Sequence, residues 1–285
     1  QRAMAAAYRI FEVLDLPLTI TDKKDAQTLD ISATETSLPV VEFRNVTFGY
    51  KPGQPVLHNI NFAIKPNTSV ALVGPTGSGK TSITALLHRF YDVWSGQVLV
   101  DGKDVRDLTQ HSLGTVIGMV LQEPFLFSGS IMENLRYGVP GATDEQVIAA
   151  TKAVRAHEFI ERMPQGYETQ LGQRGRNLSI GQRQLISFAR TLLTNPRILI
   201  LDEATANIDS FTEAAIQQAL RVLCAGRTSI IIAHRLATIR EADQILVLNH
   251  GHLVEKGNHA ELLQQRGLYY QLNNSNQSSF DVLAD

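Results

Sequence analysis

Three features are scarce in this sequence, and each scarcity excludes a class of protein. One cysteine, Cys224, stands among 285 residues, so an intrachain disulfide is excluded and a reducing compartment is favoured. The longest apolar runs, such as ILIL and SIIIA, are strand-sized, whereas a membrane-spanning helix needs about 20 residues. Basic residues are not in excess, because 26 Lys and Arg face 28 Asp and Glu for a net charge of -2. This balance argues against a nucleic-acid partner held by charge, and we expect a soluble piece.

What the chain does contain is a full complement of core-forming residues. It is 44% hydrophobic and 19% charged, which is typical of an ordinary globular protein. From Pro39 onward, strand-like runs alternate with helical runs, which predicts an α/β domain around a mainly parallel sheet. Between Phe125 and Arg190 the strand pattern nearly disappears, which predicts an inserted helical lobe. The strand-like runs are VVEFRNVTF, SVALV, QVLVD, IGMVLQ, RILILD, TSIIIAH and QILVLN.

Both ends of the chain lie outside this alternation. Residues 1–18 place apolar side chains at helical spacing without a capped start, which predicts a helix cut from something upstream. Residues 19–38 are polar and lack aromatic side chains, which is typical of a linker. Residues 273–285 are predicted to form a frayed tail. The folded domain is therefore expected to span residues 39–272, with its helical lobe at about 125–190.

The stretch GPTGSGKT, residues 74–81, lies between the strand-like run SVALV and the helical run SITALLHRFY. It matches G-x-x-x-x-G-K-[ST] in the strand–loop–helix context that this pattern requires. Gly77 and Gly79 let backbone N–H groups point inward, and Lys80 brings a mobile charge to the terminal phosphates. Thr81 is expected to hold Mg²⁺ through its hydroxyl. The loop is therefore predicted to hold a nucleoside triphosphate. The predicted nucleotide-binding residues of this segment are Gly74, Pro75, Thr76, Gly77, Ser78, Gly79, Lys80, Thr81 and Ser82.

Two adjacent acids end the buried run RILILD and open EATANID. Asp202 is predicted to bind the metal and Glu203 to orient the attacking water. Alternate residues of a strand face opposite ways, but the chain turns at the strand end, so both acids can reach one phosphate site. Without the phosphate loop, the same pair would fit a solvated strand end equally well.

Five motifs together resemble the nucleotide-binding domains of ABC transporters, over residues 39 to about 272. They are GPTGSGKT, the Gln122 of VLQEPFLFSGSIMENL, NLSIGQRQ, ILILDEATANID and the His234 of IIIAHRLATI, in the order found in that family. The opening helix and TQLGQRG, residues 169–175, further resemble the exporter branch, in which transmembrane helices precede this domain in one polypeptide. The resemblance implies a P-loop NTPase core of the RecA-like kind with an N-terminal antiparallel β part. It also implies ATP and Mg²⁺ as ligands, at the cytoplasmic face of a membrane.

The resemblance assigns further roles residue by residue. It makes Tyr50, at the end of VTFGY, the aromatic side chain that stacks on adenine. Gln122 is implied to bond the metal or water and to link the two lobes. His234 is implied to contact the γ-phosphate, and Asp209 to reach a partner subunit. Taken alone, each of these four residues would have an ordinary structural explanation.

A second anion-binding feature lies in NLSIGQRQ, residues 177–184. Ser179 is suited to cap a helix whose first N–H groups form an anion site. One phosphate loop already serves one triphosphate, so a second anion site is explained if it serves another chain's nucleotide. In the family, two domains meet head to tail around two ATP molecules. Ser179, Gly181 and Gln182 match the family pattern, while Ile180 stands where glycine is common. The expected partner is a second nucleotide-binding domain, identical or different.

The sequence therefore predicts the ATP-hydrolysing domain of an ABC exporter, joined to a transmembrane domain and without a nucleic-acid partner. One alternative is a soluble ABC-type ATPase that acts on nucleic acid or ribosomes. The absent basic patch, the opening helix and TQLGQRG argue against it. A second alternative is a non-hydrolysing regulatory module, which the presence of Glu203 disfavours.

Overall fold

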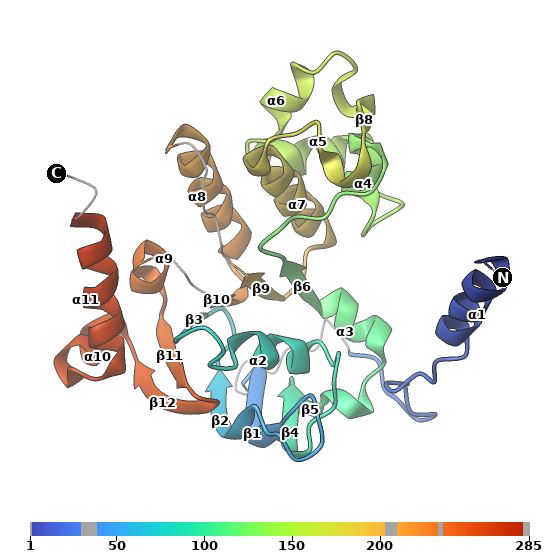
Figure 1. Cartoon of the computed structure of the whole chain (residues 1–285). Coiled ribbons are helices and arrows are strands. Elements are labelled where there is room, and N and C mark those ends of the chain that lie inside the picture. The colour runs from blue at the N-terminus through green and yellow to red at the C-terminus, as the bar shows by residue number, and fades with distance from the viewer. Residues whose placement is uncertain (1, 30–38, 203–209, 233–235, 282–285) are drawn as a thin grey trace.

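A mainly parallel sheet forms the centre of the molecule (Figure 1). The structure is a computed structural model that describes residues 2–29, 39–202, 210–232 and 236–281. Within these residues the strand order is β12-β11-β3-β10-β9-β6, and only β12 runs antiparallel to its neighbour. The strands are β3 (Ser69–Val73), β6 (Ile117–Val120), β9 (Ile198–Asp202), β10 (Thr228–Ile232), β11 (Gln244–Asn249) and β12 (His252–Gly257). The predicted parallel sheet is confirmed.

An antiparallel sheet lies beside the parallel one, as predicted for the N-terminal part. Among the described residues its order is β2-β1-β4-β5. The strands are β1 (Val41–Phe48), β2 (Leu57–Ile64), β4 (Ser95–Val100) and β5 (Lys103–Asp104). Phe43 and Phe62 stack across β1 and β2 with ring centroids 4.6 Å apart. Strand β2 is absent from the sequence-based strand runs, because polar residues such as Asn59, at φ 47°, interrupt its alternation.

The two faces of the parallel sheet are covered by different elements. Val70 and Leu72 of β3 face the antiparallel sheet, α2 (Lys80–Leu87) and α3 (Gln110–Val116). Ala71 and Val73 face the opposite way, toward the core that includes α7 (Ile180–Thr194) and α8 (Ser210–Cys224). Because both faces are covered, the central strands are continuous apolar runs, which is why they can be recognised in the sequence.

A helical lobe stands beyond the edge strand β6 (Figure 1). Its helices are α4 (Ile131–Arg136), α5 (Asp144–Ala153), α6 (His157–Glu161) and α7. Two short strands, β7 (Gly129–Ser130) and β8 (Gln170–Leu171), pair within it. The helical run at residues 144–163 forms two helices, because Arg155 adopts φ 59° between α5 and α6.

The N-terminal helix α1 (Arg2–Leu14) projects away from the body of the chain (Figure 1). Unlike α1, the described residues of the predicted linker pack on the domain. Gln27 forms a parallel bridge with Leu108, and the Asp22 carboxylate accepts a hydrogen bond from the backbone N–H of Gln110, at 2.9 Å. Its Leu29 is buried. These contacts join residues far apart in sequence, so linker composition could not reveal them.

The C-terminal part continues further than the sequence predicts. Helix α9 (Leu236–Glu241) precedes β11, and α10 (His259–Gln265) and α11 (Leu268–Asp281) follow β12. Helix α11 passes residue 272, where a frayed tail is predicted. Its start is fixed by the Glu255 carboxylate, which accepts hydrogen bonds from the N–H groups of Leu268 and Tyr269. None of the helices in the described part of the chain is both long and apolar enough to cross a membrane.

Candidate nucleotide site

The carboxyl ends of the parallel strands bring the predicted nucleotide residues to one edge of the sheet. In register, Leu72 of β3 and Asp202 of β9 both lie opposite Ile232 of β10. Gly74 therefore begins the phosphate loop two residues beyond the level of Asp202. On the other side of β9, Val120 of β6 lies opposite Leu201, so Gln122 follows at the same edge. Ligands in open α/β sheets bind at this edge.

The phosphate loop owes its shape to glycines at 74, 77 and 79. All three have positive φ, at 153°, 79° and 104°. A Cβ on Gly74 would lie 2.1 Å from the carbonyl oxygen of Leu248, so no larger residue fits there. At Gly77 the surrounding space is open and only the backbone angle favours glycine. Gly79 occupies the N-cap of α2 and leaves the first N–H groups of that helix available to a ligand.

Lys80 lies inside the loop rather than extending from it. Its side chain is largely buried, with 8% of the residue exposed. The ammonium donates to the carbonyl oxygens of Gly74 and Pro75, at 2.8 and 2.9 Å. Burial lowers the pKa of Lys80, and the nearby Asp202 carboxylate opposes that change. The sequence predicts a mobile charge; here the charge is held at the centre of the loop, where it can exchange carbonyl partners for phosphate.

Tyr50 reaches the same helix from the antiparallel sheet. Its hydroxyl and that of Ser82, in the first turn of α2, are hydrogen-bonded at 2.9 Å. The rings of Phe48 and Tyr91 both contact the Tyr50 ring edge-on, with centroid distances of 5.0 and 5.1 Å. These contacts fix the ring while leaving Tyr50 50% exposed. A fixed, exposed aromatic face beside the phosphate loop is suited to stacking on a base.

The structure describes some of the other predicted catalytic and metal-binding residues and leaves the rest outside its described ranges. Thr81 and Gln122 are exposed, and Asp202 is the last residue of β9. Glu203, Asp209 and His234 lie outside the described residues, so their predicted roles stay predictions. Pro75 and Thr76 are exposed on the phosphate loop, and Ser78 is buried beneath it.

The second stretch forms the predicted helix cap. The Ser179 hydroxyl accepts a hydrogen bond from the N–H of Gln182, at 3.1 Å, and the Gln182 side-chain oxygen accepts one from the N–H of Ser179, at 2.9 Å. Ser179 is exposed, Gly181 is buried, and Ile180 is 44% exposed at the start of α7. Within the described part of the chain, no hydrogen bond or ion pair joins residues 179–182 to the phosphate loop. The structure does not place the two stretches on one ligand.

Sequence reasoning missed a buried polar network between α4 and α7. The Asn134 side chain donates to the carbonyl oxygen of Phe127, at 2.9 Å, and its oxygen accepts from the N–H of the same residue. The guanidinium of Arg190 donates to Asn134 and to the carbonyl oxygen of Phe125. Burial lowers the pKa of Arg190, and its guanidinium lies 5.9 and 5.7 Å from the ring centroids of Phe127 and Tyr137. The network fastens the segment after Gln122 to the helix after Ser179.

The only sign of this network in the sequence is an arginine on the otherwise apolar face of α7. Ile186, Ala189 and Leu193 share that face, and an unpaired arginine among them would be costly. Its partner Asn134 is 56 residues away, so the pairing itself has no local signal.

Comparison with known proteins identifies the family of the chain. The sequence model described as ABC transporter matches residues 57–206, more than half of the chain. The chain belongs to the ABC transporter family. As a member of that family it contains a nucleotide-binding ATPase domain. The matched range contains the phosphate loop, Gln122, Ser179 and Asp202.

Similar ABC proteins extend well beyond this chain. The ABC transporter ATP-binding protein YfiC of Bacillus subtilis is 51% identical over 270 residues, which is 95% of this chain and 44% of YfiC. A fatty acid ABC transporter ATP-binding/permease protein of Mycobacterium tuberculosis is 46% identical over 276 residues, covering 95% of this chain and 42% of that protein. A solved bacterial Atm1-family ABC exporter with ATP bound has a TM-score of 0.86 and 41% identity, over 96% of this chain and 47% of that one. The chain thus spans less than half the length of these relatives.

Proposed function

We propose that this chain is the ATP-hydrolysing domain of a membrane exporter and that it works as a head-to-tail pair with a second nucleotide-binding domain. The observation that carries the proposal is the phosphate loop, in which the ammonium of Lys80 is bonded to the carbonyls of Gly74 and Pro75. Asp202 lies within electrostatic reach of this ammonium. Positioning and charge neutralisation are what phosphoryl transfer requires of a protein.

The described side chains supply suitable contacts for Mg·ATP. Tyr50 stacks on adenine, and the phosphate loop surrounds the phosphates. The hydroxyl of Thr81, the carboxylate of Asp202 and the amide oxygen of Gln122 would hold Mg²⁺, which prefers oxygen donors. When bound, the ion neutralises charge on the phosphates. The donor chemistry and the common sheet edge of these residues fit the ion.

Two residues complete the proposed hydrolysis. Glu203 follows Asp202 directly in the sequence. Its carboxylate accepts a hydrogen bond from the attacking water and orients it toward the γ-phosphate. His234 contacts the same phosphate.

The second nucleotide-binding surface serves the partner's ATP. Ser179, Gly181 and Gln182 at the start of α7, together with Asp209, contact the nucleotide held by the opposite phosphate loop. This pairing explains why one chain has two anion-binding helix starts that no described hydrogen bond or ion pair connects.

The proposed membrane partner is a transmembrane domain of the same polypeptide. The relative from Mycobacterium tuberculosis is named an ATP-binding/permease protein, and the chain matches only part of it. In this proposal, helix α1 leads toward that domain and the chain works at the cytoplasmic face of a membrane. The likeness to exporters favours this function over an ATPase that acts on nucleic acid or ribosomes.

A mixing experiment tests the shared sites. The variant Lys80→Ala has a damaged phosphate loop and an intact Ser179, whereas Ser179→Arg has the reverse. Each homodimer then contains two damaged sites, but a mixed dimer rebuilds one site from the two intact parts. We expect mixing to restore part of the ATPase rate that both variants lack alone.

The controls establish that mixed dimers form. Differently tagged chains are recovered together by pull-down in the presence of Mg·ATP. Glu203→Gln chains, which should bind ATP without hydrolysing it, provide a stable dimer standard for gel filtration. Confirmed mixed dimers with no activity above the separate variants would refute the head-to-tail arrangement.

A further inference from the structure

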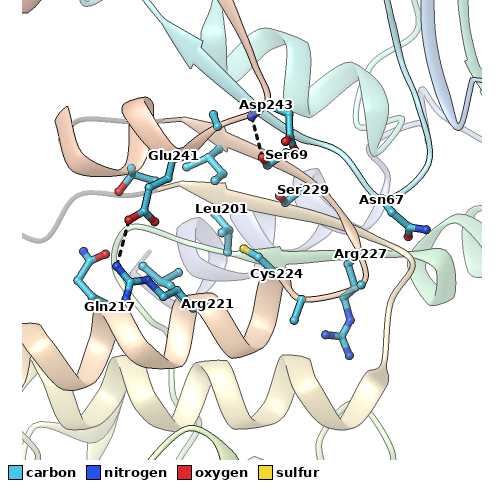
Figure 2. Close-up of a pocket in the computed structure, with 16 residues that line it drawn as sticks. Asn67, Ser69, Leu201, Gln217, Arg221, Cys224, Arg227, Ser229, Glu241 and Asp243 are labelled. Atoms are coloured by element: carbon cyan, nitrogen blue, oxygen red, sulfur yellow. Dashed lines mark hydrogen bonds and ion pairs between the residues drawn. The ribbon is translucent and has the colours of Figure 1, made fainter. Parts of the chain in front are cut away.

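A cavity of about 320 Å³ lies between α8 and α9, away from the phosphate loop (Figure 2). Its floor is the face of the parallel sheet at Leu201, Ser229 and Ile231, and its walls include Leu220 and Ala242. It reaches the amino-terminal end of β3 and β10, whereas the nucleotide residues lie at the carboxyl end. The accessible wall is predominantly apolar. The volume lies at the lower end of small-molecule sites, which run from roughly 300 to 1,000 Å³.

Two buried polar atoms of the cavity lining, the Ser229 hydroxyl oxygen and the Arg227 Nε, have no hydrogen-bond partner among the described residues. Ser229 is 1% exposed, and its hydroxyl oxygen forms no hydrogen bond with any residue that the structure describes. Its register neighbour on β3, Ser69, is satisfied, because its hydroxyl donates to the Asp243 carboxylate at 2.7 Å. An unpaired buried hydroxyl costs about 1–3 kcal/mol. A ligand group that pairs with Ser229 would remove that cost.

Most charged groups around the cavity already have partners. Arg221 of α8 and Glu241 of α9 form an ion pair at 3.0 Å between the two helices (Figure 2). The guanidinium of Arg227 donates to the carbonyl oxygen of Leu223 and to the side chain of Asn195, both at 2.8 Å. The Asp243 carboxylate is engaged by Ser69. Figure 2 shows the Arg227 guanidinium pointing away from Leu201 and Ser229, so the floor of the cavity offers an apolar surface and one hydroxyl rather than a charge.

We propose that this cavity is a binding site for a neutral molecule of one or two rings that carries a single hydrogen-bonding group directed at Ser229. Such a molecule contacts α8 and α9, the helices that begin directly after residues 203–209 and 233–235. It reaches these helices without entering the phosphate loop. A serine hydroxyl both donates and accepts, so an alcohol, a phenol or an indole-like N–H satisfies it.

The test uses 2-naphthol and 2-naphthoate, which share a two-ring body and differ in charge at neutral pH. Binding to the chain is measured by calorimetry without nucleotide, so failure here leaves the proposed ATPase function untouched. We expect saturable binding of 2-naphthol and at least tenfold weaker binding of 2-naphthoate. Tighter binding of the carboxylate, or no binding of 2-naphthol up to its solubility limit, would overturn the proposal.

Two variants locate the bound probe. Ala242→Phe fills the cavity and should abolish binding of 2-naphthol. Ser229→Ala should weaken binding about fivefold, the net worth of one neutral hydrogen bond. The matched control Ser95→Ala, at the exposed start of β4, should leave binding unchanged. Equal binding to all four proteins would mean that the probe binds elsewhere.

The variant Ser229→Ala is expected to fold normally. Removing an unpaired buried hydroxyl should leave the unliganded Ser229→Ala chain as stable as the wild type or more stable. A clear drop in its melting temperature would show that Ser229 has a partner within the protein and would also overturn the proposal.

Discussion

The two helix starts that are proposed to bind phosphate groups, those of α2 and α7, are built differently. At α2 the N-cap is Gly79, which has no side chain, and the following Lys80 brings a full charge. At α7 the N-cap is Ser179, whose side chain and that of Gln182 satisfy two backbone N–H groups reciprocally. The first start keeps its donors for a ligand, whereas the second uses some of them for its own stability.

This difference implies unequal roles. The start of α2 has glycines, a buried cation and an aromatic neighbour, which together make a nearly complete nucleotide site. The start of α7 retains the N–H groups of Ile180 and Gly181 and the helix dipole, and its approach is open because Ser179 is exposed. We expect the first to bind ATP unaided and the second to add contacts only when a partner's nucleotide is placed against it.

The largest expected effect is at Lys80. Lys80→Ala removes the only full charge inside the phosphate loop, so ATP affinity should fall by about 1.5–3 kcal/mol, the range for hydrogen bonds to charged groups, and turnover should be lost. Calorimetry with ATP and a phosphate-release assay measure the two effects. The control Lys65→Ala changes an exposed lysine after β2 and should alter neither. Unchanged ATP affinity in Lys80→Ala would remove the phosphate-loop assignment.

The next effect concerns the aromatic neighbour of α2. Tyr50→Ala should weaken ATP binding by about 1–3 kcal/mol, because a base loses its stacking surface. Tyr50→Phe keeps the ring and loses only the hydrogen bond to Ser82, so its affinity should stay close to that of the wild type. Titration with ATP in both variants separates stacking from the hydroxyl. Equal affinities for Tyr50→Ala and wild type would place adenine elsewhere.

The carboxyl end of α2 carries a partly buried histidine, His88, which should make the stability of the folded chain depend on pH. Burial lowers the pKa of His88 to about 4, so this side chain stays neutral in the folded chain. As pH falls from about 6.5 to 4, the unfolded chain takes up a proton that the folded chain does not, and stability is lost. Because His88 is partly exposed, we expect a loss of about 1–2 kcal/mol.

Chemical denaturation at several pH values measures this loss. The variant His88→Leu should lack it, so the stability of the wild type should fall relative to that of the variant as pH falls. His111→Leu, which changes an exposed histidine on α3, should keep the wild-type slope. Parallel curves for wild type and His88→Leu would contradict the assignment.

The smallest effect tests the cap of α7. Ser179→Ala removes one capping hydrogen bond and should lower the free energy of unfolding by about 1 kcal/mol. ATP affinity of the isolated chain should be unchanged, because the start of α7 is proposed to serve the partner's nucleotide. Thermal unfolding and ATP calorimetry give the two values. Weaker ATP binding by the monomer would show that both starts act on one ligand.

The sequence predicted those elements whose residue pattern is local, and it missed those that depend on contacts between distant residues. Strands β9, β10 and β11 are buried on both faces and appear as continuous apolar runs, so they were recognised. Strand β12 alternates half-exposed and exposed residues and includes Glu255 and Lys256, so it resembled a polar loop. Helix α11 continues through a stretch rich in Asn, Gln and Ser because Glu255 holds its start, a contact that sequence periodicity does not encode.

The same distinction applies to the site. The spacing of Gly74, Gly79 and Lys80 predicted the phosphate loop, because its backbone needs residues of those types at those positions. The inward position of the Lys80 ammonium depends on carbonyl groups whose directions only the folded loop defines. The pairing of Asn134 with Arg190 joins separate helices, and no pattern within either helix predicts it.

The segment after α1 has a mechanical consequence that follows from Arg89. This residue follows His88, the C-cap of α2, its side chain is 3% exposed, and it donates to the carbonyl oxygens of Thr21 and Leu108. Pulling the segment after α1 away would remove the Thr21 hydrogen bond and the Asp22 ion pair from this buried cation, which is costly. A force applied along α1 is therefore transmitted through this connection to the carboxyl end of α2, whereas a flexible linker would absorb it. Helix α2 is about 12 Å long. The force therefore acts at the carboxyl end of this helix, and the phosphate loop lies at its amino end.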